Sequence, residues 1–225
     1  MKVIVVGSGK LANAILSSKP IIAEVEVCKW EQFRESTTEK VVVVHAGSGR
    51  QLGECLDFCS RTKSVMIELS TGLQTENLNP DFPLIVCPNT SILILKMMHL
   101  LQKYGNHFVR DAVSITESHQ SSKKTEPGTA YAFAQSLQVQ KNAIQSIRDP
   151  NVQRKEIGIP EEFLDKHAFH RIVISDGTDE IKIETKVLGH NSYSKGVNKI
   201  IEAIANQKLE NRRYSVLELI EKQII

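Results

Sequence analysis

The sequence predicts an α/β fold in which a Rossmann dinucleotide-binding domain is followed by an α+β region. Three observations support this prediction. Short apolar runs alternate with helical patterns over residues 1–90, a glycine turn comes directly after the first run, and longer strands of alternating polarity follow later in the chain. The early runs are nearly continuous in Val and Ile, as expected of parallel strands that are covered on both faces.

The predicted Rossmann elements begin near residue 2. Apolar runs predict strands at residues 2–6, 21–28, 41–45, 64–69 and 84–87. Helical patterns between them predict helices at residues 10–18 and 49–61. Strands and helices that alternate in this order are typical of parallel strands joined by helical crossovers.

The pattern changes after Pro88, which marks a candidate domain boundary. Helices are predicted at residues 91–104 and 129–147, with a strand at 111–118 between them and a polar stretch at 148–162 after them. Strands at 168–175 and 180–188 flank Asp176-Gly177-Thr178-Asp179, whose composition predicts a hairpin turn. Two more helices are predicted at residues 194–206 and 214–223.

The composition of the 225 residues narrows the classes of function. The formal net charge is +2 and the basic residues are scattered, so we expect no nucleic-acid partner. The chain contains no apolar stretch of the roughly 18 residues that span a bilayer, and its first residues resemble a buried strand and not a signal peptide. We therefore expect no membrane association and a cytoplasmic location.

The four cysteines favour reduced thiols over disulfides or zinc ligands. They lack CxxC spacing and lie in apolar or helical contexts, at Cys28, Cys55, Cys59 and Cys87. Cys55 and Cys59 are spaced to share a helix face, but no histidine lies near them in sequence. We therefore expect no metal site.

The glycine turn is the first candidate binding site. Gly7, Gly9 and Ala12 form a G-x-G-x-x-A pattern between the first predicted strand and the first predicted helix. In a dinucleotide-binding turn, Gly7 would permit the tight bend, Gly9 would admit a pyrophosphate, and the helix that begins with Lys10 and Leu11 would offer unpaired N–H groups. The alternative is a glycine turn in another kind of α/β protein.

The residue after the second predicted strand bears on the choice of cofactor. NAD-selective Rossmann folds usually carry an acid there, which binds the ribose hydroxyls. This chain has Lys29, with Glu31 slightly beyond. Lys29 and Lys10 would suit the 2′-phosphate of NADPH, whereas Glu31 keeps NADH open. Both lysines are nearly as well explained as ordinary surface residues.

The segment at residues 117–130 carries the densest set of chemical groups. His119 offers a group that titrates near neutrality and Lys123 a cation, and either suits a proton donor for reduction of a double bond. Gly128 and Thr129 begin a predicted helix, where N–H groups and a hydroxyl can hold a carboxylate. A polar loop with an N-cap threonine explains the same residues equally well.

Four other histidines receive no catalytic role from the sequence. His99 and His107 lie on or beside a predicted helix without a partner, which favours structural or surface roles. His167 and His170 begin an alternating strand, so they are either packed side chains or neighbours of the substrate.

Several motifs together resemble the 4-hydroxy-tetrahydrodipicolinate (dihydrodipicolinate) reductase family. The segment at 117–130 is similar to the family's E-x-H-H-x-x-K-x-D-A-P-S-G-T-A signature, with matches in order at Glu117, His119, Lys123, Pro127, Gly128, Thr129 and Ala130. Ser70-Thr71-Gly72 resembles the family's T-T-G, and Pro88-Asn89-Thr90-Ser91 its P-N-F-S. His170 and the segment Ser192-Tyr193-Ser194-Lys195-Gly196, similar to F-A-x-G, extend the resemblance over nearly the whole chain.

The resemblance implies a homotetramer of two-domain subunits. Residues 1–90 and 191–225 would form the Rossmann domain, and residues 91–190 an α+β domain for substrate binding and tetramerisation. The implied reaction uses NADPH or NADH to reduce 4-hydroxy-tetrahydrodipicolinate, a small dicarboxylate, to tetrahydrodipicolinate in lysine and diaminopimelate biosynthesis.

The resemblance also implies roles for single residues. His119 and Lys123 would supply the proton, while Gln120, Gly128 and Thr129 would bind the substrate. Cofactor binding is implied for a group of loop residues that lie after the predicted Rossmann strands, namely Gly7, Gly9, Lys10, Leu11, Lys29, Ser70, Gly72 and Asn89.

The sequence also departs from the family pattern. Gln120 replaces the second histidine, Thr125 the aspartate and Glu126 the alanine, and the serine before Gly128 is missing. Further differences lie at Lys10, at His190, which replaces an arginine, and at His45-Ala46-Gly47-Ser48 in place of F-T-x-P. Three interpretations stay open: the family reaction, reduction of another small imino or oxo acid, and a non-catalytic dinucleotide-binding protein.

Overall fold

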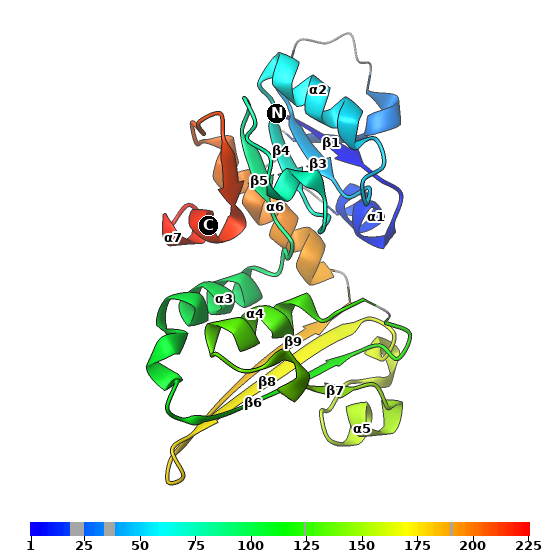
Figure 1. The fold of residues 1–225 in the computed structure, drawn as a ribbon. Coiled ribbons are helices and arrows are strands. Elements are labelled where there is room, and N and C mark those ends of the chain that lie inside the picture. The colour runs from blue at the N-terminus through cyan, green and yellow to red at the C-terminus, as the bar shows by residue number, and fades with distance from the viewer. Residues whose placement is uncertain (19–24, 34–38, 124, 190) are drawn as a thin grey trace. The chain divides into compact units, whose positions relative to one another are not determined.

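The computed structural model describes residues 1–18, 25–33, 39–123, 125–189 and 191–225. They form two compact units, one built from Met1–Leu95 with His190–Ile225 and one from Lys96–Gly189 (Figure 1). The first contains a parallel sheet of the Rossmann type and the second a mixed sheet, so the predicted fold class is confirmed.

The first unit is organised by a six-stranded parallel sheet in the order β10-β5-β4-β3-β1-β2. Its strands are β1 (Lys2–Val6), β2 (Glu26–Lys29), β3 (Val42–His45), β4 (Val65–Glu68), β5 (Leu84–Val86) and β10 (Arg213–Ser215). The chain extends the sheet from β1 to β2 on one side and from β1 to β3 on the other. Open α/β sheets bind ligands at the carboxyl ends of the strands near such a switch point.

Helices cover both faces of this sheet. They are α1 (Lys10–Ser17), α2 (Leu52–Thr62), α6 (Asn191–Ala205) and α7 (Val216–Glu221), while α3 (Ile92–Tyr104) begins in this unit and continues in the second. Cys55, Phe58 and Cys59 of α2 are buried against Trp30 and the apolar side chains of the strands. All four cysteines are free, and only Cys28 is partly exposed.

Gly196 lets α6 approach the loop after β5. A Cβ atom at this position would lie 1.6 Å from the carbonyl oxygen of Thr90. The hydroxyl of Thr90 donates to the carbonyl of Tyr193 at 2.9 Å, which fixes the same approach. The glycine of the motif at 192–196 is therefore required by packing.

The second unit contains a four-stranded sheet in the order β7-β6-β8-β9. Its strands are β6 (Ala112–His119), β7 (Gln145–Ile147), β8 (His167–Ser175) and β9 (Glu180–Leu188). β6 pairs antiparallel with β8 and parallel with β7, and β8 pairs antiparallel with β9. Within this unit, α3 and α4 (Gly128–Ser136) lie along one face of the sheet, and α5 (Pro150–Lys155) lies beside β7.

The predicted hairpin is present between β8 and β9. Asp176 accepts hydrogen bonds from the backbone N–H groups of Thr178 and Asp179, both at 2.8 Å, and Gly177 has a φ of 96°. Five short 3-10 helices complete the described elements, at Trp30–Gln32, Gln74–Glu76, Gly105–Phe108, Lys141–Ala143 and Glu161–Phe163.

The predicted helix at 129–147 is wrong over its second half. α4 ends at Ser136, and Gln138 adopts a left-handed conformation with a φ of 57°. The backbone N–H of Val139 then donates to the carbonyl of Ala134 at 2.8 Å, a bond that closes the helix end. The chain returns as β7, because pairing with β6 overrides the helical pattern of residues 139–147.

Two other predictions need correction. The polar stretch at 148–162 contains α5, whose N-cap Asp149 accepts from the N–H of Asn151 at 2.7 Å. The predicted helix at 214–223 is shorter, because Arg213–Ser215 forms β10 at the edge of the parallel sheet. The predicted second strand falls partly on residues 21–24, which lie outside the described residues.

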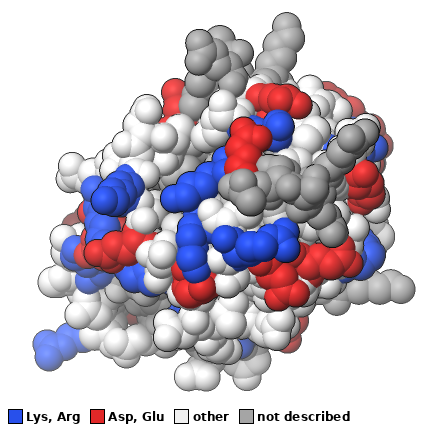
Figure 2. Space-filling model, turned by 90° about the horizontal axis from the view of Figure 1, so that it is seen from above, with Lys and Arg blue, Asp and Glu red and all other residues white. Residues whose placement is uncertain are grey.

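The surface carries both signs of charge. On the face shown in Figure 2, lysine and arginine side chains are interspersed with acidic ones. In the described part of the chain, the helices are too short or too polar to cross a membrane.

Candidate active site

Glu117 and His119 form the centre of a polar cluster at the end of β6. The Nδ1 atom of His119 lies 2.6 Å from Oε2 of Glu117, and Nη2 of Arg148 lies 2.6 Å from Oε1 of the same carboxyl. The Glu117 side chain is fully buried, whereas that of His119 is 14% exposed. β6 holds both residues, and β7 delivers Arg148 because it pairs with β6.

The electrostatics of Glu117 fix the orientation of His119. Burial alone would raise the pKa of this carboxyl, but hydrogen bonds from His119, Arg148 and Ser146 outweigh burial and lower the pKa to about 2. The carboxylate is therefore ionised at neutral pH and acts only as an acceptor. Nδ1 of His119 must carry a hydrogen, which leaves Nε2 as the nitrogen for exchange with a ligand.

The backbone around His119 is held by Gln153 of α5. The side chain of Gln153 is fully buried, and its amide donates to the carbonyl oxygens of His119 at 2.8 Å and Ile147 at 3.2 Å. One side chain therefore joins the ends of β6 and β7. This joint keeps Arg148 close to Glu117.

Two histidines of β8 line the neighbourhood of His119. His170 is buried, and its ring packs edge-on against the rings of His119 and Phe133, with centroids 5.8 and 5.5 Å apart. Burial lowers the pKa of His170 to about 3, helped by the nearby His119. His170 is therefore neutral and serves as a packing surface for His119.

His167 is also neutral, but it faces Ser118. Burial lowers its pKa, and its Nδ1 lies 3.1 Å from the carbonyl oxygen of Phe163, to which it donates. Its Nε2 consequently accepts from the hydroxyl of Ser118 at 2.9 Å. Both ring nitrogens of His167 therefore have hydrogen-bond partners within the fold.

Lys123 lies in the loop after β6, close enough to interact with Glu117. Burial lowers the pKa of Lys123; the charge of Glu117 opposes this shift and that of Arg148 adds to it. Its Nζ donates to the hydroxyl of Thr125 at 2.8 Å. The ammonium therefore has a neutral acceptor at the position of the family's aspartate, which favours release of its proton.

The other predicted substrate residues surround this loop. The backbone carbonyl of Gln120 accepts from the backbone N–H of Lys123 at 3.0 Å, and this bond closes the turn that places the lysine. Gly128 is the first residue of α4, and the first turn of this helix contains no acidic residue. A Cβ at Gly128 would stand in open space. Thr129 follows it in the first turn of α4. This helix start suits a carboxylate.

The predicted phosphate turn lies at the carboxyl end of β1. Gly7 has a φ of 119°, and a Cβ there would lie 2.5 Å from the carbonyl oxygen of Ala46. Gly9 precedes Lys10, the first residue of α1, and a Cβ on it would meet no described atom within 4 Å. Lys10 is exposed and Leu11 partly buried. The turn therefore offers open space at an uncapped helix start, which fits a phosphate group.

The other predicted cofactor residues lie at the same edge of the sheet. Ser70 and Gly72 follow β4, Asn89 follows β5, and Lys29 is the last residue of β2, opposite Val5 of β1. The Ser70 hydroxyl accepts from the N–H of Ser48 at 3.1 Å, and the Asn89 side chain accepts from the N–H of Ser91 at 2.8 Å. Both side chains therefore shape their loops.

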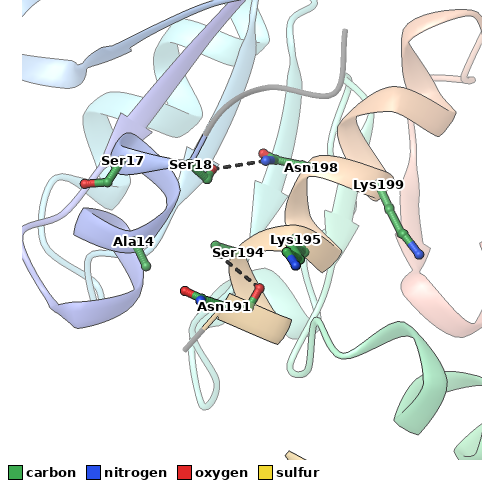
Figure 3. Close-up of a pocket in the computed structure, with 8 residues that line it drawn as sticks. All are labelled: Ala14, Ser17, Ser18, Asn191, Ser194, Lys195, Asn198 and Lys199. Carbon is green, nitrogen blue, oxygen red and sulfur yellow. Dashed lines mark hydrogen bonds between the residues drawn. The ribbon is translucent and has the colours of Figure 1, made fainter. Parts of the chain in front are cut away.

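A hollow of about 520 Å³ lies elsewhere in this unit, between α1 and α6 (Figure 3). Its polar lining includes Ser17, Ser18, Ser194, Lys195, Asn198 and Lys199. Asn198 donates to the hydroxyl of Ser18 at 3.0 Å across it. The hollow includes none of the predicted site residues.

Comparison with known proteins assigns the family. The family profile described as "Dihydrodipicolinate reductase, C-terminus" matches residues 92–220, which is more than half of the chain. The chain belongs to the dihydrodipicolinate reductase family. It is a divergent member, and its resemblance to that family is confirmed.

Relatives of this dihydrodipicolinate reductase family member include plant proteins. It is 28% identical over 142 residues to "4-hydroxy-tetrahydrodipicolinate reductase 2, chloroplastic" from Arabidopsis thaliana, an alignment that covers 58% of this chain and 41% of the relative. It is 32% identical over 113 residues to "Probable 4-hydroxy-tetrahydrodipicolinate reductase 2, chloroplastic" from Oryza sativa subsp. japonica, with 47% and 35% covered. The chain thus spans about two fifths or less of the length of these relatives.

A solved structure supports the fold over the whole chain. The dipicolinate-bound dihydrodipicolinate reductase from Paenisporosarcina sp. TG-14 matches with a TM-score of 0.65 and 18% identity. The match covers 97% of this chain and 98% of that one. At this identity the likeness concerns the fold.

Sequence reasoning missed several residues of the site. Glu117 matches a motif position to which the sequence assigns no role, and Arg148 and Gln153 lie in a stretch that the sequence predicts only to be polar. The Asp149-Pro150 pair, an N-cap followed by proline at the first helical position, was the available signal for α5. The substitution at His190 lies outside the described residues.

Proposed function

We propose that the chain reduces 4-hydroxy-tetrahydrodipicolinate to tetrahydrodipicolinate with NADPH or NADH, in lysine and diaminopimelate biosynthesis. The overall reaction takes up one hydride and one proton and releases one water molecule. The observation that carries the proposal is the buried Glu117 carboxylate, which orients His119 and also acts on the charge of Lys123, in a segment that matches the family signature.

Each residue of the loop has a proposed task. The Glu117 carboxylate holds Nδ1 of His119, so His119 would donate at Nε2, and the Lys123 ammonium is the other donor that could supply the one proton taken up. The first turn of α4, with Gly128 and Thr129, would hold a carboxylate of the substrate, and Gln120 would contribute beside it. Buried, neutral His170 excludes water from one side of the His119 ring.

The cofactor, when bound, supplies the hydride. The open space at Gly9 and the start of α1 would hold its pyrophosphate, with the N–H groups of Lys10 and Leu11 directed toward the phosphate oxygens. Ser70, Gly72 and Asn89 would border the nicotinamide. Lys29 at the end of β2 and Lys10 favour NADPH, while Glu31 leaves NADH as the alternative.

The proposal is tested by an oxidation assay. Purified protein is mixed with NADPH or NADH and with substrate generated in situ by the preceding synthase, and the loss of nicotinamide absorbance is followed. We expect oxidation with at least one cofactor. Cofactor binding without oxidation would contradict the proposal and favour a non-catalytic dinucleotide-binding protein. Oxidation only with another cyclic imino acid would assign a different substrate.

Two variants separate binding from chemistry. Lys123→Ala should lower turnover by about 10²-fold or more, the usual effect of losing a positioned proton donor. Gly9→Ala should leave folding intact, because its methyl group meets no described atom. It should raise the cofactor Kd by about tenfold or more, through lost charge-assisted hydrogen bonds to phosphate. An unchanged Kd would place the phosphates elsewhere.

The assembly and the compartment are also proposals. We propose a homotetramer, as the family resemblance implies, and a cytoplasmic location, with which the four free thiols agree. Sedimentation equilibrium of the purified chain would show a mass near four times 25.2 kDa. A monomer at micromolar concentration would contradict this assembly.

A further inference from the structure

His45 and Glu68 form a fully buried pair at the carboxyl edge of the parallel sheet. His45 is the last residue of β3 and Glu68 the last residue of β4, and both side chains are 0% exposed. Nδ1 of His45 lies 2.8 Å from Oε1 of Glu68. The pair thus joins the carboxyl ends of two neighbouring strands.

The contacts of the His45 ring fit a charged imidazolium beside an ionised Glu68. Its Nε2 lies 2.9 Å from the carbonyl oxygen of Arg50, so both ring nitrogens face acceptors. Only a doubly protonated ring can donate to a carboxylate and a carbonyl together. Burial lowers the pKa of His45, but the bonds to Glu68 and Arg50 outweigh burial and hold the pKa above its ordinary 6.5.

The pair joins two of the loops that border the proposed cofactor site. The contact between His45 and the Arg50 carbonyl closes the loop after β3. Gly47 permits this contact because it has no Cβ, which would lie 2.9 Å from both His45 Nε2 and the Arg50 oxygen. Through Glu68, the pair holds the loop after β4, since Oε1 of Glu68 also accepts the N–H of Ser70 at 2.7 Å.

The same loops contact the glycine turn. The backbone N–H of Ala46 donates to the carbonyl of Val6 at 2.8 Å, and the carbonyl of Ala46 occupies the space that a Cβ on Gly7 would need. Ser48 donates its N–H to the hydroxyl of Ser70. The loops after β1, β3 and β4 are therefore connected through a single buried ion pair and its neighbours.

We infer that His45 and Glu68 are positioning residues for the cofactor, and that deprotonation of His45 weakens cofactor binding. This inference rests on the proposed function. Replacing a buried ion pair by apolar side chains of similar size is often neutral or stabilising, so stability alone does not account for the pair, and its contacts to two loops point to positioning. A neutral His45 can donate only once, so either the Arg50 or the Glu68 contact becomes a contact between two acceptors.

Arg50 and Cys55 are titratable neighbours of the pair. The positive charge of Arg50 opposes protonation of His45, and Glu68 favours it. The thiol of Cys55 on α2 also interacts with Glu68, but burial raises the pKa of this thiol to about 12, so it stays neutral. Oε2 of Glu68 is buried without a hydrogen-bond partner among the described residues. His45, whose pKa is raised from its ordinary 6.5, is therefore the group of this cluster whose charge the pH titration follows.

The first test reads the protonation of His45 directly. Long-range ¹H–¹⁵N spectra of the cofactor-free protein, with His45→Phe for assignment, should show both ring nitrogens of His45 protonated at neutral pH. A neutral tautomer there would overturn the inference, whatever the protein's activity.

The second test measures the Kd for NADH and NADPH by fluorescence titration between about pH 5.5 and 9.5. NADH is included because it lacks the 2′-phosphate, which titrates in the same range. Kd of the wild type should rise with pH above the His45 pKa, by up to about tenfold per pH unit for one linked proton. The double variant His45→Phe/Glu68→Leu should bind more weakly at low pH and lack this dependence.

His107→Asn is the matched control, because His107 is an exposed histidine of the other unit, and it should keep the wild-type profile. A wild-type Kd that does not change with pH, or the same dependence in the double variant, would overturn the inference and leave the proposed function intact. Binding of neither cofactor at any pH would overturn both.

Discussion

Glu117 combines full burial with a charge, and this determines what its replacement should do. Glutamine keeps the size of the side chain but turns an obligate acceptor into a group that can also donate to Nδ1 of His119. The ring can then adopt the opposite tautomer. We expect Glu117→Gln to lower kcat by about 10²-fold or more, with little change in the cofactor Kd. Glu184→Gln, which disturbs the partly exposed pair with Arg171, is the control.

The same carboxyl predicts a pH dependence of stability. Its pKa in the folded protein, about 2, lies below the ordinary value of 4.5. Its contribution to stability is therefore complete above pH 4.5 and is lost as the pH falls toward 2. The difference in Tm between wild type and Glu117→Gln should be largest near neutral pH and shrink on acidification. A constant difference would mean that Glu117 is not ionised in the fold.

Thr125 offers a way to adjust Lys123. Thr125→Asp restores the family's residue and places a carboxylate where the Lys123 ammonium now contacts a hydroxyl. An opposite charge raises the pKa of a lysine, and an acid catalyst works only while protonated. The basic limb of the kcat profile should therefore move to higher pH. Thr125→Asn introduces a side chain of the same shape as aspartate but without its charge, so it should leave the basic limb in place. Equal pH profiles for the two variants would argue against Lys123 as the acid.

At the level of elements, the end of α4 depends on an unfavourable backbone conformation. Gln138 has a φ of 57°, which glycine adopts more readily than residues with a side chain. Gln138→Gly should stabilise the protein by about 0.5–1 kcal/mol in urea unfolding. Gln140→Gly is the matched control, since the φ of Gln140 is −68°, and it should be neutral or destabilising.

These elements also show what the sequence could predict. β1 and the glycine turn were predictable because a continuous Val/Ile run and two glycines leave few other conformations. The end of α4 was not, because its left-handed position carries glutamine, and β7 is three residues long with two of them polar. Only pairing with β6 makes β7 a strand.

The candidate site follows the same division. His119 and Lys123 are four residues apart, so a local motif sufficed to suggest that they act together. Arg148 reaches Glu117 from 31 residues away through the register of β7, and His45 meets Glu68 through the register of β3 and β4. Contacts of this kind depend on strand pairing, which composition and spacing do not encode.

For the whole molecule, Gly196 joins segments from opposite parts of the chain. The Rossmann unit is built from the segments Met1–Leu95 and His190–Ile225. The Thr90 carbonyl, which faces Gly196, belongs to the first segment, and α6 belongs to the second. Gly196→Ala should destabilise that unit by about 3 kcal/mol or more in urea unfolding, because backbone cannot move aside as a side chain can. Gly53→Ala in α2, where a Cβ meets no described atom, should be neutral or stabilising.

The discontinuous Rossmann unit has a consequence for synthesis on the ribosome. The segment Lys96–Gly189 is translated without interruption and has all four strands of its own sheet, so it can fold as it emerges. β5 emerges earlier but must wait for β10, its edge partner, and α1 must wait for α6. Within the Rossmann unit, the segment that is translated first is thus completed only after the second unit has been made. Meanwhile its unpaired strand edge and apolar helix surface are open to chaperones and to misassembly with other nascent chains.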